Sequence, residues 1–158
     1  MKERAFINKN NLYIFVFFSI SILINNHYAN LGAFPIDTFY HFDLGFKILK
    51  GMVPFSDIWM VSGPVVNYIQ ALFFYVLGIN WFSYVLHASI FNCIITLSTY
   101  FLLKDFKINI NYCFIYSIFF AVLAYPSSGT PFVDHHSTFF SLLGFYSILL
   151  AIKNNKKI

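Results

Sequence analysis

The chain has 158 residues, of which 59% are hydrophobic and only 10% are charged, and its mean hydropathy is +0.69. A soluble domain carries about 25% charged residues, so this composition excludes a soluble globular protein and predicts an integral membrane protein. The net charge of +4 comes from basic residues near the termini and loop edges, which is typical of membrane topology rather than of nucleic-acid binding.

The N-terminal segment MKERAFINKN is basic, and an apolar run at residues 12–24 follows it. An apolar run of this length also suits the core of a signal peptide, but the next residues, NNHY, form no small-x-small cleavage site. We therefore expect an uncleaved first span at 11–28 with a cytoplasmic N-terminus, because basic residues precede the span. A cleaved signal peptide is the alternative.

The stretch at 29–64 is the longest one without an apolar run of membrane length, and we expect it to form an external loop. Within this loop, residues 37–50 have the pattern of an amphipathic helix. Asp37 can cap its start, Gly51 ends it, and Pro54 prevents it from continuing.

The two faces of this predicted helix differ in chemistry. One face carries Phe39, Phe42, Phe46 and Leu49. The other face carries Asp43, Lys47 and Lys50. A helix divided in this way lies in the interface plane of a membrane, so we expect its aromatic face to contact lipid.

Four apolar segments follow, at 65–79, 81–103, 108–125 and 132–152. The second is long enough to cross a membrane, and the third and fourth cross it if their polar edges are included. The first covers only about 22 Å of a hydrocarbon core about 30 Å thick. It is therefore either a short span or a re-entrant helix.

The number of crossings decides which loops share a side. If all four segments cross, the lysine clusters of the C-terminal half fall outside, against the positive-inside tendency, and the loop at 126–137 lies opposite Asp37. If 65–79 is re-entrant or interfacial, every lysine cluster moves inside and both polar loops face outside. We prefer this second topology, and the first is the alternative.

These segments predict an all-α fold, a polytopic membrane helical bundle of about four to five spans. An interfacial amphipathic helix lies in its first external loop. The sequence contains no internal repeat or linker, so we expect one membrane domain over 1–158.

Ionisable residues at membrane depth are costly to bury, so their presence there indicates a functional or structural role. Asp37 and His41 are four residues apart on one face of the predicted helix. The Asp37 carboxylate can take a proton from an acceptor hydroxyl as a general base, and Lys47 or Lys50 can neutralise a phosphate leaving group. The alternative is that Asp37 only caps the helix and that Asp43 forms a solvated pair with Lys47.

The loop at 126–137 holds a second polar cluster, formed by Asp134, His135 and His136. Adjacent histidines on a helix point about 100° apart, so they are poor partners for one metal ion. We expect hydrogen bonding to substrate, or the start of a helix, at this cluster. A divalent metal held together with Asp37 or His41 is the alternative.

Two polar residues, His87 and Asn92, lie inside the predicted span at 81–103. We expect them to form hydrogen bonds between helices, as buried polar side chains do in membrane bundles. The sequence shows no Gly-rich phosphate loop, nucleophile elbow or metalloprotease helix.

Short motifs follow one another in a fixed order along the chain. They are Asp37-Thr38-Phe39-Tyr40, Gly51-Met52-Val53-Pro54-Phe55-Ser56-Asp57, Gly63-Pro64, Leu77-Gly78 and the polar stretch from Pro126 to His136. In this order and spacing the chain resembles the polytopic, lipid-sugar-dependent glycosyltransferases of the C-type fold. These include protein O-mannosyltransferases, the aminoarabinose transferases of lipid A and their bacterial relatives. The resemblance covers essentially the whole chain, but only the N-terminal part of such an enzyme.

The resemblance implies a function and a set of site residues. In the family the first-loop Asp is the catalytic acidic residue, and Asp37 is the position that matches it. An acidic residue often follows that Asp, but this chain has Thr38, which weakens a two-carboxylate or metal-bridging role. The residues that we expect to bind the donor phosphate or the substrate are His41, Lys47, Lys50, Asp57, Asp134, His135 and His136.

The implied reaction transfers a sugar from a polyprenyl-phosphate donor to a hydroxyl-bearing glycan, lipid or protein at the outer face of a bacterial plasma membrane. We expect no cofactor and no nucleic-acid partner. We also expect this chain to be inactive alone, as the N-terminal part of an enzyme. The alternative is a non-catalytic small membrane protein, a partner in lipid-carrier translocation or assembly. A transporter is disfavoured, because the predicted spans contain His87 but no carboxylate.

Overall fold

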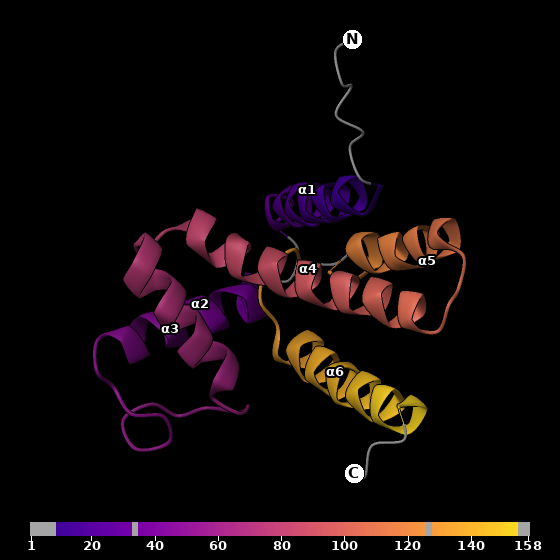
Figure 1. Ribbon diagram of the computed structural model, residues 1–158. Helices are drawn as coiled ribbons and strands as arrows, with labels where there is room; N and C mark the ends of the chain where they lie inside the picture. The colour runs from indigo at the N-terminus through magenta and orange to yellow at the C-terminus, as the bar shows by residue number, and fades with distance from the viewer. Residues whose placement is uncertain (1–8, 33–34, 126–127, 155–158) are drawn as a thin grey trace.

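The computed structural model describes residues 9–32, 35–125 and 128–154, which form α-helices and no β-strand (Figure 1). The helices are Lys9–Ala29 (α1), Pro35–Leu49 (α2), Val65–Leu77 (α3), Trp81–Asp105 (α4), Ile110–Leu123 (α5) and Val133–Lys153 (α6). For this part of the chain, the prediction of an all-helical fold is confirmed.

Three of these helices, α1, α4 and α6, are long and apolar enough to cross a membrane, with 21, 25 and 21 residues. The two other apolar helices, α3 and α5, have 13 and 14 residues. At 1.5 Å per residue each covers about 20 Å, less than a hydrocarbon core of about 30 Å. Helix α5 is shorter than the predicted segment at 108–125, because Asn109 caps its start. The Asn109 side chain accepts a hydrogen bond from the backbone amide of Asn111.

Helix α4 lies at the centre of the bundle and contacts α1, α3, α5 and α6 (Figure 1). It runs antiparallel to α1. Asn92 in the first half of α4 contacts Asn25 near the end of α1, whereas Tyr100 near the end of α4 contacts Asn10 at the start of α1. Because α1 and α4 are antiparallel, the segment between them begins and ends at the same end of the bundle, where α1 finishes. This segment includes α2 and α3.

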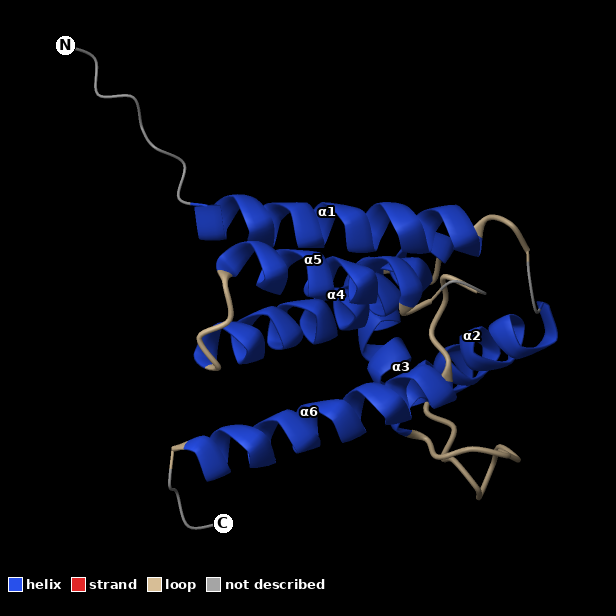
Figure 2. Ribbon diagram, turned by 90° about the vertical axis from the view of Figure 1, so that its right-hand side faces the viewer, coloured by secondary structure: helices blue, strands red, loops and turns tan. Residues whose placement is uncertain are grey.

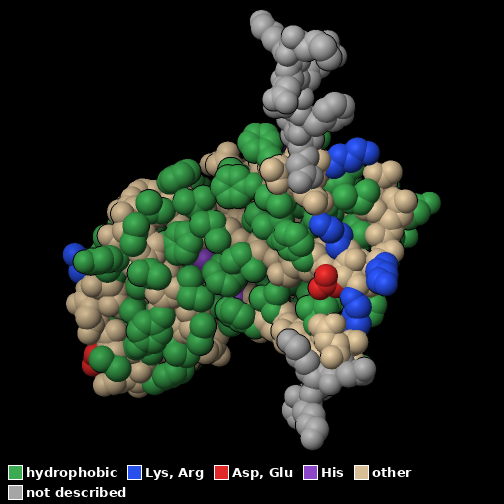
Figure 3. Space-filling view, viewed as in Figure 1, with side chains coloured by type: hydrophobic (Ala, Val, Ile, Leu, Met, Phe, Trp, Pro, Cys, Tyr) green, Lys and Arg blue, Asp and Glu red, His purple; other side chains and the backbone are tan. Residues whose placement is uncertain are grey.

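The bundle therefore has two chemically different ends. At one end, here called the basic end, Lys104 bonds to Asn10, and Lys153 bonds to the backbone of Asp105. Figure 3 shows Lys side chains gathered there, beside a surface that is otherwise largely apolar. The opposite end, here called the acidic end, holds the first turns of α2 and α6 with Asp37 and Asp134.

Polar side chains join the helices inside this apolar bundle. The Asn92 amide donates to Asn25 Oδ1 at 3.1 Å and to the carbonyl oxygen of Ala121 at 2.9 Å, so it links α4 to α1 and α5. His87 links α4 to α3 and α6 through Gln70 and His136. The prediction that Asn92 and His87 form interhelical hydrogen bonds is confirmed.

Helix α2 packs closely against α3, and a glycine permits this approach. A Cβ atom on Gly45 would lie 2.7 Å from Cγ of Gln70, closer than side chains can pack. The ring of Phe42 lies 4.8 Å from that of Phe74 and 5.2 Å from that of Tyr84. The expectation that the aromatic face of α2 contacts lipid is therefore wrong for Phe42, although Phe39 is exposed. An apolar helix face packs equally well on lipid and on another helix.

The bounds of α2 also differ from the prediction. The helix begins at Pro35, because the fixed φ angle of proline suits the first helical position. Asp37 thus lies in the first turn and is not the N-cap. At the other end, the Gly51 amide donates to the carbonyl of Ile48 and closes the last turn, as the sequence indicates.

We predict that Asn92→Ala lowers the free energy of unfolding by about 1 to 2 kcal/mol, because it removes two hydrogen bonds between helices that have no water to replace them. Denaturant unfolding in detergent or bicelles measures the change. Asn26→Ala is the matched control, since the Asn26 side chain is exposed and contacts Asn30 in the same segment. Equal stabilities of the two variants would contradict the role given to Asn92.

Candidate functional site

The first turn of α2 presents Asp37 at the acidic end of the bundle, with its side chain exposed. The start of a helix carries a partial positive charge, which stabilises a carboxylate there. The next residue, Thr38, faces the protein. Its hydroxyl lies 3.3 Å from that of Thr130, and its carbonyl accepts a hydrogen bond from Tyr84 at 2.6 Å. These two contacts fix the turn that carries Asp37 against α4 and against the segment before α6.

The segment that carries Thr130 is itself held against the end of α1. A Cβ atom on Gly129 would overlap the carbonyl oxygen of Asn25 and the amide nitrogen of Ala29. The φ angle of Gly129 is +64°, a value that favours glycine. This close approach joins the end of α1, the start of α2 and the start of α6 at one place.

His41 lies one turn after Asp37 and is almost fully buried, with 3% of its surface exposed. Its Nδ1 atom is 3.0 Å from Oδ1 of Asn67 on α3. Burial lowers the pKa of His41 below its ordinary value, and the hydrogen bond to Asn67 and the carboxylates of Asp37 and Asp134 act in the opposite direction. The His41 ring also lies 6.0 Å from the ring of Phe132, the residue before α6, so the first turns of α2 and α6 meet at this imidazole.

A second chain of hydrogen bonds runs behind this histidine. Nδ1 of His87 lies 2.8 Å from the Gln70 side chain, Nε2 of His87 lies 3.0 Å from Nε2 of His136, and Nδ1 of His136 lies 2.8 Å from the carbonyl of Phe132. Both histidines and Gln70 are fully buried. The chain joins α3, α4 and α6.

One arrangement of protons keeps both imidazoles neutral and satisfies every contact. His136 must donate from Nδ1 to the Phe132 carbonyl, so its Nε2 accepts from His87. His87 then accepts at Nδ1, which requires the NH₂ group of Gln70 to face it. Because amide O and N atoms are assigned from such networks, this contact fixes the orientation of Gln70. The network is a positioning framework without a charged group.

Asp134 and His135 lie in the first turn of α6, and the predicted loop at 126–137 therefore ends earlier, at Phe132. The Asp134 side chain is exposed, and its backbone carbonyl accepts hydrogen bonds from the hydroxyls of Ser137 and Thr138. The ring of His135 lies 4.8 Å from the ring of Tyr125. Its Nδ1 atom is buried without a hydrogen-bond partner among the described residues.

Lys47 and Lys50 lie toward the other end of α2. Lys47 forms an ion pair of 2.7 Å with Asp43, and the Lys50 ammonium lies 5.6 Å from the centre of the Phe46 ring. At the helical rise per residue, Asp37 is separated from Lys47 by about 15 Å and from Lys50 by about 20 Å along the axis. The structure does not bring these lysines to the carboxylate with which the sequence analysis paired them.

Asp57 has a local role in the loop after α2. Its carboxylate accepts hydrogen bonds from the backbone amide of Val53 at 2.8 Å and from the hydroxyl of Ser56 at 3.3 Å. These bonds close the turn around Pro54, where an isolated β-bridge joins Pro54 to Ile58. The Gly-x-x-Pro-Phe-x-Asp motif therefore forms a compact turn, and Asp57 stabilises it.

Five of the candidate residues come together at the acidic end, namely Asp37, His41, Asp134, His135 and His136. The sequence analysis missed the partners that hold them, which are Asn67, Gln70, Tyr84 and Thr130. Two of these partners could have been recognised from the sequence. Asn67 and Gln70 are three residues apart in an apolar helix, so they share one face and indicate a polar contact on it.

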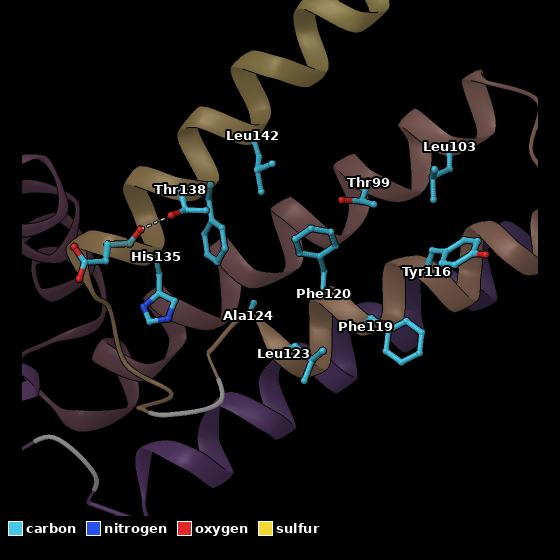
Figure 4. A pocket seen from close by; sticks show the side chains of 12 residues that line it. Thr99, Leu103, Tyr116, Phe119, Phe120, Leu123, Ala124, His135, Thr138 and Leu142 are labelled. Carbon is cyan, nitrogen blue, oxygen red and sulfur yellow. Dashed lines mark hydrogen bonds between the residues drawn. The ribbon is translucent and has the colours of Figure 1, made fainter.

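A groove lies between α4, α5 and α6, and its volume is about 780 Å³ (Figure 4). We call it the α4–α5–α6 groove. Its lining residues are Thr99, Leu103, Tyr116, Phe119, Phe120, Leu123, Ala124, Asp134, His135, Thr138, Phe139 and Leu142. Most of the lining is apolar, and the polar residues Asp134, His135 and Thr138 lie together where α6 begins.

Comparisons of the chain with protein-family models, with curated proteins and with solved structures find no match. Within residues 9–32, 35–125 and 128–154, no three His, Cys, Asp or Glu side chains are grouped in a way that could hold a metal ion. The function must therefore be argued from the geometry of the acidic end.

We predict that stability depends on pH through His41. The unfolded chain binds a proton near pH 6.5, whereas the folded chain binds it only at a lower pH, so the stabilising contribution is complete above about pH 6.5 and is lost as the pH falls below it. His41→Gln removes this part of the pH dependence, which denaturant titrations between pH 5 and 8 measure. His27→Gln, at an exposed histidine, is the matched control, and a change of equal size in both variants would contradict the role given to His41.

Proposed function

We propose that this protein is a membrane glycosyltransferase, or the N-terminal part of one. The enzyme transfers a sugar from a polyprenyl-phosphate donor to a hydroxyl acceptor at the outer face of a bacterial plasma membrane. The observation that carries the proposal is that the first turn of α2 and the start of α6, which carry the exposed Asp37 and Asp134, meet at one place. There the Thr38 and Thr130 hydroxyls lie 3.3 Å apart, and the ring of His41 lies 6.0 Å from that of Phe132. A pair of carboxylates held at one end of an apolar bundle suits chemistry on a hydroxyl group.

The membrane topology that we propose has four crossings, by α1, α4, α5 and α6, with α2 and α3 at the outer face. The antiparallel course of α1 and α4 supports it, because the chain between them then crosses an even number of times. The lysines of the basic end support a cytoplasmic position for that end. The short α5 crosses with the help of its polar flanks or of a locally thinner bilayer.

In the proposed reaction Asp37 is the general base. Its carboxylate takes the proton of the acceptor hydroxyl as the oxygen attacks the anomeric carbon of the donor. The bond between that carbon and the phosphate oxygen breaks, and the phosphate leaves with the electron pair, so the configuration at the anomeric carbon inverts. The exposure of Asp37 and its fixed backbone support this role, since a base must reach the substrate in a defined geometry.

The buried network has a positioning role in this proposal. Tyr84 and Thr130 hold the turn of Asp37, and the contacts of His41 with Asn67 and of His87 with His136 hold α2, α3 and α6 on α4. All of these bonds are formed in the resting structure. The base is therefore held before any substrate binds, which reduces the entropy that substrate binding must offset.

The distance of Lys47 and Lys50 from Asp37 changes one part of the expected mechanism. Attack places the acceptor oxygen and the leaving phosphate on opposite sides of a single carbon atom, so a cation about 15 Å away does not neutralise that phosphate. We propose that the two lysines contact lipid phosphates at the interface. The same distance favours the second candidate function, a non-catalytic partner in lipid-carrier translocation or assembly, in which α2 is an anchor.

The topology predicts which positions are accessible from outside. Single cysteines at positions 37 and 134 react with a membrane-impermeant maleimide in intact cells, whereas a cysteine at position 104 reacts only after permeabilisation. The background carries Ala at Cys93 and Cys113, which are both buried and free. Labelling of only one of the two acidic positions would separate the residues of the proposed site and refute it.

The base assignment predicts that Asp37→Asn in the full-length natural protein lowers the rate of sugar transfer by a factor of about 10² to 10⁴. Membrane insertion and expression stay unchanged, because the side chain is exposed. Transfer of radiolabelled sugar to acceptor in membrane vesicles measures the rate.

Asp43→Asn is the matched control for this measurement. Asp43 is an exposed carboxylate on the same helix, and its partner is Lys47. This variant keeps the rate of transfer. If Asp37→Asn transfers sugar as fast as Asp43→Asn, Asp37 is not the base and the anchoring function is favoured.

A further inference from the structure

We propose that the α4–α5–α6 groove binds the apolar chain of a lipid alcohol and holds its hydroxyl group at Asp134 and His135. The acceptor of the transfer reaction is then a lipid with an uncharged hydroxyl head group. The binding claim stands on the groove alone, whereas the acceptor role rests on the proposed function.

The shape of the groove suits an extended apolar chain. Helix α6 packs on α4 and diverges from α5 along its length (Figure 2). The wall from α5 carries Phe119, Phe120 and Leu123, and the floor from α4 carries Thr99, whose hydroxyl is already bonded to Tyr146 at 3.0 Å. A volume of about 780 Å³ lies within the range of ligand-binding pockets.

The polar end of the groove has unused hydrogen-bonding capacity. Nδ1 of His135 is buried and has no partner among the described residues, and the Asp134 carboxylate forms no ion pair within that part of the chain. Figure 4 shows the His135 ring directed into the space between α6 and the end of α5. A hydroxyl group can donate to the Asp134 carboxylate or bond to the His135 imidazole, because it is both a donor and an acceptor.

The charge at this end selects between the possible lipids. A polyprenyl or alkyl phosphate would place its negative charge beside the Asp134 carboxylate, and no lysine or arginine lines the groove. Lys104 and Lys153 belong to the basic end, at the opposite ends of their helices. Like charges a few ångströms apart repel, so the groove disfavours a phosphate head group and accepts an alcohol.

The position of the groove relates it to the proposed base. The Thr130 hydroxyl, just before α6, lies 3.3 Å from that of Thr38, so the polar end of the groove and the turn that carries Asp37 lie at the same end of the bundle. A lipid alcohol in the groove would present its hydroxyl there, whereas the donor phosphate must approach from another side. The groove is thus assigned to the acceptor.

The test uses two photoactivatable probes of equal length, a diazirine-bearing hexadecanol and the matching hexadecyl phosphate, with the full-length protein in phosphatidylcholine vesicles. Labelled peptides are mapped by mass spectrometry. The alcohol is expected to label α5 and α6 residues of the groove about tenfold more than the phosphate does, equivalent to about 1.4 kcal/mol. Equal labelling by both probes identifies bulk lipid and overturns the proposal, and so does a groove that neither probe labels because protein covers it.

Two pairs of variants localise the effect. Leu123→Trp fills the groove and is expected to abolish the labelling, whereas Leu72→Trp, at an equally exposed site on α3, leaves it unchanged. Asp134→Asn removes the preference for the alcohol, whereas Asp43→Asn keeps it. A preference that survives Asp134→Asn overturns the assignment of the head-group site.

The labelling experiment and the transfer assay test the lipid site and the proposed base separately. Labelling that follows these expectations while Asp37→Asn leaves transfer intact keeps the lipid site and rejects the proposed base. Loss of transfer in Asp37→Asn without alcohol-selective labelling keeps the base and rejects the lipid site.

Discussion

The polar face of α4 is the constraint on which the rest of the structure depends. In a lipid environment, burial of apolar side chains gives little net attraction between helices, so packing and hydrogen bonds decide which helices associate. Three residues on this face, His87, Asn92 and Thr99, bond to side chains on α3, α6 and α1, and Asn92 also bonds to the backbone of α5. Each bond fixes both the partner and the register of its helix, because a shift by one residue rotates a side chain by about 100°.

The sequence predicts where the helices lie along the chain better than it predicts which helices contact one another. Apolar runs, Pro35 and Gly51 determine where the helices begin and end, and the isolated polar residues His87 and Asn92 indicate interhelical bonds. The partner of each polar residue depends on contacts that are distant in sequence, such as that between Thr38 and Thr130, and no periodicity encodes them. The same limit explains Phe42, since an apolar face carries the same pattern whether lipid or a helix covers it.

The candidate site was predictable in part for the same physical reason. A charged residue in a strongly apolar chain is conspicuous, which draws attention to Asp37 and to the cluster at Asp134. The approach of the starts of α2 and α6 needs the antiparallel course of α1 and α4, which the sequence only suggests through its charge distribution. Lys47 was conspicuous too, but an i, i+4 partner, Asp43, satisfies it locally. A charged residue that is rare in an apolar chain is recognisable as important, but its rarity does not indicate which residue it contacts.

The separation of charges along the bundle has a consequence for catalysis. The lysines of the described chain lie either at the basic end or along α2 beyond Asp43, so the acidic end has a negative potential. Such a potential repels a phosphate diester or monoester that approaches along the same path. A transferase built on this end therefore has to bring the donor phosphate from a different side, with its own cation. In the proposed reaction, this requirement separates the donor path from the acceptor path, to which we assign the groove beside Asp134.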